Sequence, residues 1–365
     1  MRVLFVSAPL LGHVFPVVPL ARAVRAAGHE VLVATAAEAL RVRAAGLPVA
    51  DIGPGFRFDR IARRVMLRHP LIARAELAGT AGTRGVGLLF GTVNEEIVDP
   101  VGTVADRFRP DLIVYEPLAV AGAVAAARRD IPAIRQENNL FDGAVLVDAT
   151  AQPALRRHRV DGLPEPAAVL QIAPPALVGE RTGWPMRHVP YSGGGDLPGW
   201  LAERPARPRI AVSRSTVAGP GSGGVMGAVV AVAERVDAEI VLVRPEPRLA
   251  RRLPANVRAV DWVPLDLLLT TCAGLVHHGG AGTVLGALVA GVPQLVVPGP
   301  GDRRHNASIV QRAGVGLAVP ARAIGADTLH RLCLEPGLLA GARAVQAQIA
   351  ARPDPSAVAA RLLAR

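Results

Sequence analysis

Residues 274–283 read GLVHHGGAGT. A short apolar run, Gly274–His277, has the composition of a buried strand and passes directly into a glycine-rich turn. A helical pattern then continues to Ala290. This order of strand, turn and helix recurs along the chain. It predicts an α/β fold in which parallel sheets carry helices on both faces.

Two similar α/β halves are expected on either side of residues 190–208, which hold a glycine triplet and four prolines. The chain has 365 residues, more than one hydrophobic core usually serves. We therefore expect two Rossmann-like, doubly wound domains that face each other across a cleft. The N-terminal domain would span residues 1–195 and the C-terminal domain 196–350, with a tail helix over 351–365. Strands are predicted over 2–7, 30–34, 111–115, 133–134, 209–213, 239–243, 257–260, 274–277 and 294–297.

Two segments, 55–95 and 139–175, look less regular because Gly, Pro, Arg and apolar residues are mixed in them. Insertions of this kind often shape a substrate cleft.

The net charge is +11, and every basic residue is arginine. The arginines are scattered and aromatic residues are few, so the sequence disfavours nucleic acid as a partner. The two cysteines, Cys272 and Cys333, form neither a zinc motif nor a disulfide framework. The apolar start is a poor signal peptide, and no run is long enough for a stable membrane anchor. We expect a cytoplasmic protein.

The turn at residues 278–283 suits a diphosphate. Glycines let the backbone approach a ligand, and a helix N-terminus offers N–H groups and partial positive charge. His278 and Thr283 would add side-chain donors. A turn needed only for packing is the alternative. The segment is not a P-loop, since no Gly-Lys-Ser/Thr follows, and its place in the second half of the chain disfavours a dinucleotide fingerprint.

The set HHGGAGT, Trp262-Val-Pro264, Gly291-Val-Pro293 and Asp302 with Asn306-Ala307 resembles the nucleotide-sugar half of GT-B inverting glycosyltransferases. The resemblance is strongest to bacterial enzymes that attach deoxysugars to polyketide and enediyne antibiotics. It continues less strongly in Gly12-His13-Val-Phe-Pro16 and in residues 189–194.

This resemblance implies inverting transfer of a deoxysugar from a dTDP-sugar to a hydroxyl of a hydrophobic natural-product aglycone. It also implies that the N-terminal domain binds the acceptor, that the C-terminal domain binds the nucleotide sugar, and that the tail helix over 351–365 packs back on the N-terminal domain. The nucleotide sugar would be a cosubstrate, with no resident cofactor. The donor-site residues that it implies are Ser213, Thr216, Trp262, Val263, His278, Gly280, Gly282, Thr283, Asp302 and Arg303. Arg214-Ser215 departs from the family, which has a smaller pair ending in Gly.

His13 is the expected general base, in a loop after the first strand. Histidine is suited to removing a hydroxyl proton near neutral pH. Glu116 matches the family's acidic partner, usually Asp, which would orient the imidazole. A helix-capping histidine and a solvent-facing Glu116 are the alternatives. No metal site is expected, because the sequence holds no Asp-x-Asp and no cluster of histidines.

Two further positions bear on the donor. Gly286 stands where UDP-sugar enzymes of the family often carry a Glu for the ribose hydroxyls, which favours dTDP. Arg303 replaces a Gln that binds sugar hydroxyls. Either Arg303 reads a sugar rich in acceptor groups, or it turns to solvent or to a phosphate.

Three alternatives for the whole chain stay open: a lipid-acceptor glycosyltransferase, a sugar-nucleotide epimerase of the same layout, and a catalytically silent helper protein. An apolar, arginine-rich stretch at 60–77 would serve a lipid acceptor. The sequence does not decide between a monomer and a homodimer.

Overall fold

A computed structural model describes residues 1–216 and 224–364. The chain divides into two compact units. Unit 1 comprises residues 1–173, 180–187 and 352–365, and unit 2 comprises 174–179 and 188–351. This division differs from the boundary expected at 195/196, because residues 174–179 and 188–195 group with unit 2. The chain enters unit 2 at residue 174, returns to unit 1 at residue 180 and enters unit 2 again at residue 188. The local composition does not indicate these crossings.

Unit 1 holds a parallel sheet of seven strands in the order β3-β2-β1-β4-β5-β6-β7. Phe5, in the middle of β1, pairs with Val33 of β2 and Val114 of β4. The strands are β1 (Arg2–Val6), β2 (Glu30–Thr35), β3 (Val49–Asp51), β4 (Leu112–Tyr115), β5 (Ala133–Gln136), β6 (Ala168–Gln171) and β7 (Trp184–Pro185).

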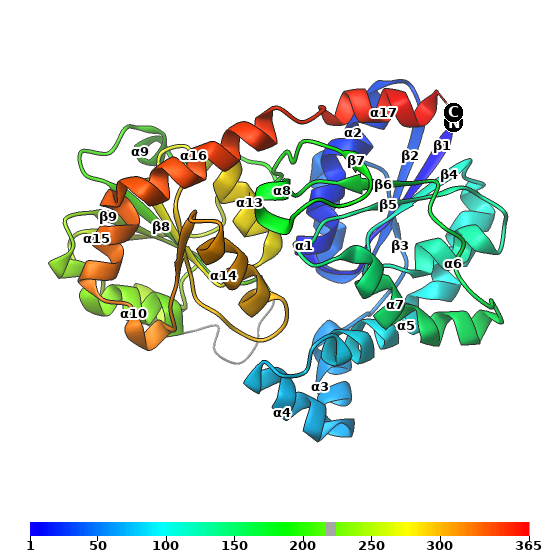
Figure 1. Ribbon diagram of the computed structural model, residues 1–365, viewed down its shortest axis with the longest axis horizontal. Coiled ribbons are helices and arrows are strands. Elements are labelled where there is room, and N and C mark those ends of the chain that lie inside the picture. Colours follow the sequence, from blue (N-terminus) through cyan, green and yellow to red (C-terminus); the bar gives the residue numbers. More distant parts are fainter. Residues whose placement is uncertain (217–223, 365) are drawn as a thin grey trace. The chain divides into compact units, whose positions relative to one another are not determined.

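Unit 2 holds a parallel sheet of six strands in the order β10-β9-β8-β11-β12-β13. The strands are β8 (Arg209–Ser213), β9 (Glu239–Val243), β10 (Val257–Val260), β11 (Gly274–His277), β12 (Gln294–Val296) and β13 (Gly316–Ala318). Four of these, β8 to β11, have the bounds that the sequence predicts. The expectation of two parallel α/β sheets is confirmed (Figure 1).

The segments expected to be irregular are largely helical, which corrects that prediction. The helices of unit 1 are α1 (Leu11–Val14), α2 (Val18–Ala26), α3 (Phe58–Arg68), α4 (Pro70–Ala78), α5 (Arg84–Phe108), α6 (Ala121–Ala127), α7 (Gly143–His158) and α17 (Pro355–Leu363), with 3-10 turns at Phe15–Val17 and Ala37–Ala45. The glycines that suggested loops sit where α5 meets α7. A Cβ at Gly87 would come within 2.8 Å of the Ala149 carbonyl oxygen, and one at Gly91 within 3.1 Å of Pro153.

In unit 2, the helices are α8 (Pro175–Val178), α9 (Gly199–Ala202), α10 (Gly224–Val232), α11 (Pro247–Ala250), α12 (Leu265–Leu269), α13 (Ala281–Val289), α14 (Arg303–Arg312), α15 (Ala326–Leu334) and α16 (Pro336–Ala350). Residues 233–235 and 321–323 form 3-10 turns. Apolar residues of β8, β9 and β11 are fully buried beneath these helices, among them Ile210, Leu242 and Val276.

The C-terminal helix α17 belongs to unit 1 and packs against α2 (Figure 1). The guanidinium of Arg361 lies 3.7 Å from the centroid of the Trp184 ring, and Arg187 forms an ion pair with Asp354. Arg352 donates to the carbonyl oxygen of Ala173 at 2.9 Å. These contacts fix the tail within unit 1, except for Arg365, which lies outside the described residues.

Candidate active site

In each sheet, the residues singled out by the sequence follow strands at the point where the strand order reverses. In unit 1 this point lies between β1 and β4, and in unit 2 between β8 and β11. Parallel sheets leave a crevice at the carboxyl ends of such strands, and ligands bind there. His13 follows β1 and Glu116 follows β4, whereas His278 follows β11 and Ser213 ends β8.

His13 lies in the one-turn helix α1 rather than in a loop, which corrects the sequence expectation. Its Nδ1 atom is 3.3 Å from Oε2 of Glu116, and the two side chains are 16% and 0% exposed. A carboxylate at Nδ1 holds the proton there, so the neutral ring presents Nε2 as its basic nitrogen. The predicted pair is therefore assembled within unit 1.

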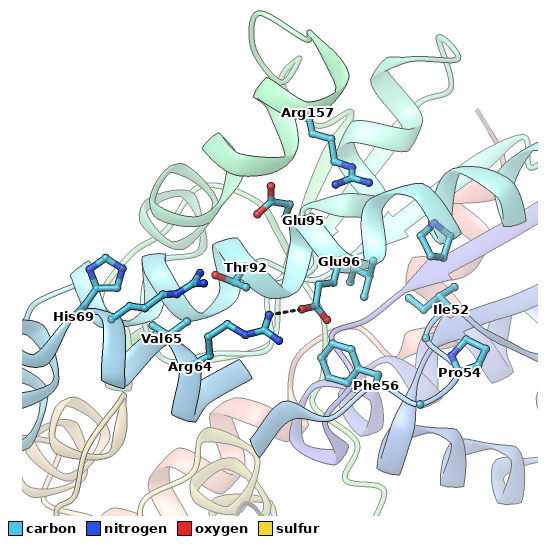
Figure 2. A pocket seen from close by; sticks show the side chains of 15 residues that line it. Ile52, Pro54, Phe56, Arg64, Val65, His69, Thr92, Glu95, Glu96 and Arg157 are labelled. Carbon is cyan, nitrogen blue, oxygen red and sulfur yellow. Dashed lines mark ion pairs between the residues drawn. The ribbon is translucent and has the colours of Figure 1, made fainter. Parts of the chain in front are cut away.

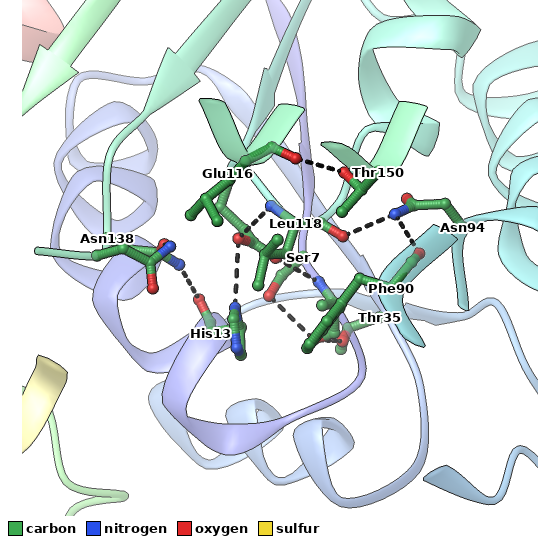
Figure 3. A network of polar contacts seen from close by, with 12 residues as sticks. Ser7, His13, Thr35, Phe90, Asn94, Glu116, Leu118, Asn138 and Thr150 are labelled. Atoms are coloured by element: carbon green, nitrogen blue, oxygen red, sulfur yellow. Dashed lines mark hydrogen bonds and ion pairs between the residues drawn. The ribbon is translucent and has the colours of Figure 1, made fainter. Parts of the chain in front are cut away.

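Glu116 is buried and fully engaged, so it is not the solvent-facing residue of the alternative interpretation. Its Oε1 accepts from the backbone N–H of Ala8 at 3.0 Å, and its Oε2 accepts from that of Leu118 at 2.9 Å (Figure 3). Both carboxylate oxygens are therefore held by backbone N–H groups. The backbone segments that follow β1 and β4 therefore accommodate the side chain of Glu, which is longer than that of Asp.

Two neighbours of His13 were not identified from sequence. Asn138 donates from Nδ2 to the backbone oxygen of His13 at 3.2 Å, which ties α1 to the segment after β5 (Figure 3). The ring of Phe90 lies 5.5 Å from that of His13, and Phe58 lies 5.9 Å from Phe90. An aromatic row therefore leads away from the imidazole. No local motif signals it, because Phe58 and Phe90 belong to segments expected to be irregular.

A cavity of about 690 Å³ opens elsewhere on unit 1, and neither His13 nor Glu116 lines it (Figure 2). Its wall carries both charges, including an ion pair in which Nη1 of Arg64 lies 3.7 Å from Oε1 of Glu96. The lining residues are Ile52–Phe56, Arg64, Val65, Arg68, His69, Thr92, Glu95–Ile97, Pro100 and Arg157. Several of them belong to the 55–95 segment, so that segment does form a concave surface.

The glycine-rich turn of unit 2 has a backbone that requires glycine. Gly279 has φ +92°, and a Cβ there would meet Val296 at 2.9 Å and the Arg303 carbonyl oxygen at 3.1 Å. A Cβ at Gly280 would lie 2.8 Å from Nε2 of His278. Gly280 is the N-cap of α13 and no side chain caps this helix, so its first N–H groups are available to an anion.

The two adjacent histidines have different surroundings. His277 is fully buried: the N–H of Gly279 donates to its Nδ1 at 3.1 Å, and its Nε2 donates to Oε1 of Gln294 at 2.9 Å. Burial lowers the pKa of His277 to about 4. The pair with Gln294 thus fixes the tautomer that supports the turn, and only the tertiary structure reveals it.

His278 is partly exposed, and its Nδ1 has no hydrogen-bond partner among the described residues. Burial, followed by the positive charges nearby, lowers the pKa of His278 well below its ordinary value. The ring is therefore neutral near pH 7 and has one N–H to donate to a ligand.

The other predicted donor residues in this group follow strands β8, β10 and β11. Ser213 ends β8 and Thr216 is exposed just beyond it. Trp262 follows β10, and its Nε1 donates to the Ser192 oxygen at 3.0 Å. Val263 is buried. Gly282 and Thr283 lie in the first turn of α13, where the N–H of Thr283 donates to Gly280 at 3.0 Å.

Asp302 and Arg303 begin α14 and point to different neighbours. Asp302 accepts from Nδ2 of Asn306 at 2.7 Å, and the same Nδ2 lies 2.7 Å from the Gly279 oxygen. Asn306 thereby joins α14 to the glycine-rich turn. Arg303 donates from Nη2 to Oγ of Ser215 at 3.1 Å.

Arg244 is a further residue that the sequence did not single out. It follows β9 with φ +58° and donates from Nη2 to the backbone oxygen of Ser215 at 3.2 Å. Its guanidinium lies 5.2 Å from the centroid of the Trp262 ring. An arginine among scattered arginines gives no sequence signal, and only the strand order brings it to this loop.

Within residues 1–216 and 224–364, no three His, Cys, Asp or Glu side chains gather as metal ligands would. No helix in the same ranges is both long and apolar enough to cross a bilayer.

Comparison with known proteins identifies relatives over the whole chain. Family models for the N- and C-terminal domains of erythromycin biosynthesis protein CIII-like proteins match residues 22–215 and 227–365. The elloramycin glycosyltransferase ElmGT of Streptomyces olivaceus is 39% identical, over 99% of this chain and 97% of the relative.

Solved structures agree in fold and in sequence. The glycosyltransferase SnogD from Streptomyces nogalater matches with a TM-score of 0.82 and 35% identity, over 100% of this chain and 99% of that one. Streptomyces sp. SF2575 glycosyltransferase SsfS6, complexed with thymidine diphosphate, matches with a TM-score of 0.85 and 28% identity over 100% of both chains. The chain is a GT-B glycosyltransferase, and it belongs to the erythromycin biosynthesis protein CIII-like family.

Proposed function

We propose that this glycosyltransferase moves a deoxysugar from a dTDP-sugar to a hydroxyl group of a hydrophobic natural-product aglycone, with inversion at the anomeric carbon. The observation that carries the proposal is the contact between His13 and buried Glu116, 3.3 Å apart. In this pair Glu116 holds the His13 proton on Nδ1, so that Nε2 can act as a base. A catalytically silent helper protein would not need such a base.

The reaction would proceed in one displacement. The acceptor hydroxyl oxygen attacks the anomeric carbon while its proton passes to Nε2 of His13. The bond between the anomeric carbon and the β-phosphate oxygen breaks, and its electron pair leaves with the nucleoside diphosphate. Glu116 stabilises the imidazolium that forms. Attack from the face opposite the leaving group gives the inverted anomer.

The nucleotide assignment is supported by the SsfS6 complex with thymidine diphosphate and by Gly286, which is not acidic. The acceptor class is supported by the name of ElmGT and by the aromatic row of Phe58 and Phe90 beside His13. We propose that transfer is independent of added metal, and that the first turn of α13 and His278 bind the diphosphate instead.

The test is a matrix of purified protein, several dTDP- and UDP-sugars and a panel of polyketide aglycones, read by mass spectrometry. With a dTDP donor, we expect a product whose mass exceeds that of the aglycone by one deoxysugar residue. The coupling constant of its anomeric proton, measured by NMR, reports whether the configuration is inverted. His13→Ala is the matched negative control. EDTA should leave turnover unchanged. A retained anomeric configuration, or equal product with His13→Ala, would contradict the mechanism.

A further inference from the structure

We propose that Arg303 and Arg244 bind the diphosphate of the donor, together with His278, and take up the charge that develops on the leaving nucleotide. This inference rests on the proposed function and assigns two ligand-contacting residues to its donor site. It also decides between the two interpretations of Arg303, in favour of phosphate rather than sugar.

Two guanidinium groups converge on one residue of unit 2. Arg303 begins α14 and Arg244 follows β9, yet both guanidinium groups reach the same residue, Ser215. Arg303 donates to its Oγ at 3.1 Å and Arg244 to its backbone oxygen at 3.2 Å. Ser215 lies just beyond β8, at the reversal of strand order where a ligand of this sheet is expected. Two cations are thus brought to the mouth of the crevice.

Both cations also act on the glycine-rich turn. The backbone of Arg303 packs against Gly279, where an added Cβ would come within 3.1 Å of the Arg303 oxygen. Both Arg303 and Arg244 lower the pKa of His278 by their positive charge, after the larger effect of burial. The two guanidinium groups therefore lie close enough to act on the residue expected to contact phosphate.

Several donors of this site are suited to binding an anion. Nδ1 of His278 has no hydrogen-bond partner among the described residues, and α13 begins without a side-chain cap. Burial lowers the pKa of Arg303, with Asp302 opposing that effect, which shows that its charge is partly desolvated. A desolvated guanidinium beside an uncapped helix N-terminus gains most from an anion with several oxygens. A diphosphate satisfies all of these groups at once.

The sugar interpretation fits this geometry less well. The carboxylate of Asp302 accepts from Nδ2 of Asn306 within α14. Arg303 instead extends past Gly299, where a Cβ would lie 3.1 Å from its Cδ, towards Ser215 in the loop after β8. The side chain of Arg303 is thus directed to the same loop that Arg244 contacts.

The experiment compares binding of dTDP, dTMP and thymidine by calorimetry for the wild type, Arg303→Gln and Arg244→Gln. Arg312→Gln is the matched control, since Arg312 is exposed at the opposite end of the same helix α14. Loss of one charge-assisted contact should weaken dTDP binding about tenfold to a hundredfold. Thymidine affinity should change less than about twofold, because thymidine lacks the phosphates. The loss should shrink as salt is raised.

Each outcome has one meaning. Variants that bind dTDP as the wild type does would overturn the inference while leaving the proposed function intact. A wild type that binds no dTDP would overturn the proposed function itself. Retained thymidine binding shows that a variant is folded, and Arg303→Lys, which keeps a charge but loses the planar fork, should bind dTDP with intermediate affinity. With two dTDP-sugars, Arg303→Gln should lower kcat/KM equally, whereas a selective loss for one sugar would restore the sugar interpretation.

Discussion

Glu116→Gln tests the hydrogen-bonding and the charge of the buried carboxylate together. In the structure, both carboxylate oxygens accept from backbone N–H groups, those of Ala8 and Leu118, and Oε2 also faces Nδ1 of His13. A glutamine has one oxygen and one NH2 group. Whichever way the amide is placed, its NH2 faces a backbone N–H, so one buried donor loses its acceptor.

The size of the effect follows from this count. A buried unsatisfied donor costs about 1–3 kcal/mol. A loss of about 2 kcal/mol should lower Tm by about 4–8 °C for a unit of this size. Turnover should fall by about a hundredfold to ten-thousandfold. The neutral amide provides no negative charge to stabilise the His13 imidazolium. If its NH2 group faces Nδ1, it also favours the tautomer protonated at Nε2, which cannot accept the proton of the acceptor hydroxyl.

Thermal unfolding and glycosyl transfer should be measured on Glu116→Gln, Glu116→Asp and the control Glu165→Gln, which changes an exposed carboxylate of the same unit. Glu116→Asp keeps the charge and should lose less turnover than Glu116→Gln. A Glu116→Gln protein with wild-type Tm and turnover would refute the reasoning. A lowered Tm with full turnover would leave Glu116 a purely structural role.

Three further predictions follow from the same structure. His13→Ala should lower turnover about a hundredfold or more while the Kd for dTDP stays unchanged; wild-type turnover would remove His13 from the mechanism. Wild-type protein should bind dTDP more tightly than UDP, and Gly286→Glu, at a position where a Cβ meets no atom within 4 Å, should narrow that difference in calorimetry; tighter UDP binding by the wild type would be the contrary result. Burial lowers the pKa of His188 to about 4, below the ordinary 6.5, so the unfolded chain takes up the proton first. The free energy of unfolding should therefore fall by roughly 3 kcal/mol from this group as pH drops from about 6.5 to about 4. His188→Gln should lessen that fall in urea titrations at pH 7 and pH 5, and an identical pH dependence would argue against a buried neutral His188.

The alternation of apolar strand, glycine-rich turn and helix was sufficient to predict two parallel α/β sheets. Strands β8 to β11 were placed to the residue because each is a short, mainly apolar run that is followed by a charged residue or, for β11, by the glycine-rich turn. The helices α5 and α7 were missed for the opposite reason. Their glycines and the internal prolines, Pro100 and Pro153, resemble loop signals, but the glycines allow close helix packing.

The order of residues along the chain was enough to predict the chemical groups of the site: a histidine after the first strand, an acid after β4, and a glycine-rich turn with His278 after β11. These groups could be predicted because each follows its strand directly in the sequence. The partners of these groups depend on the three-dimensional fold. The order of strands in the sheet brings Arg244 and Arg303 together at Ser215. The fold of unit 1 buries Glu116 where its carboxylate accepts from two backbone N–H groups. These contacts join residues far apart in sequence, and their energies depend on distance and desolvation, neither of which a linear pattern contains.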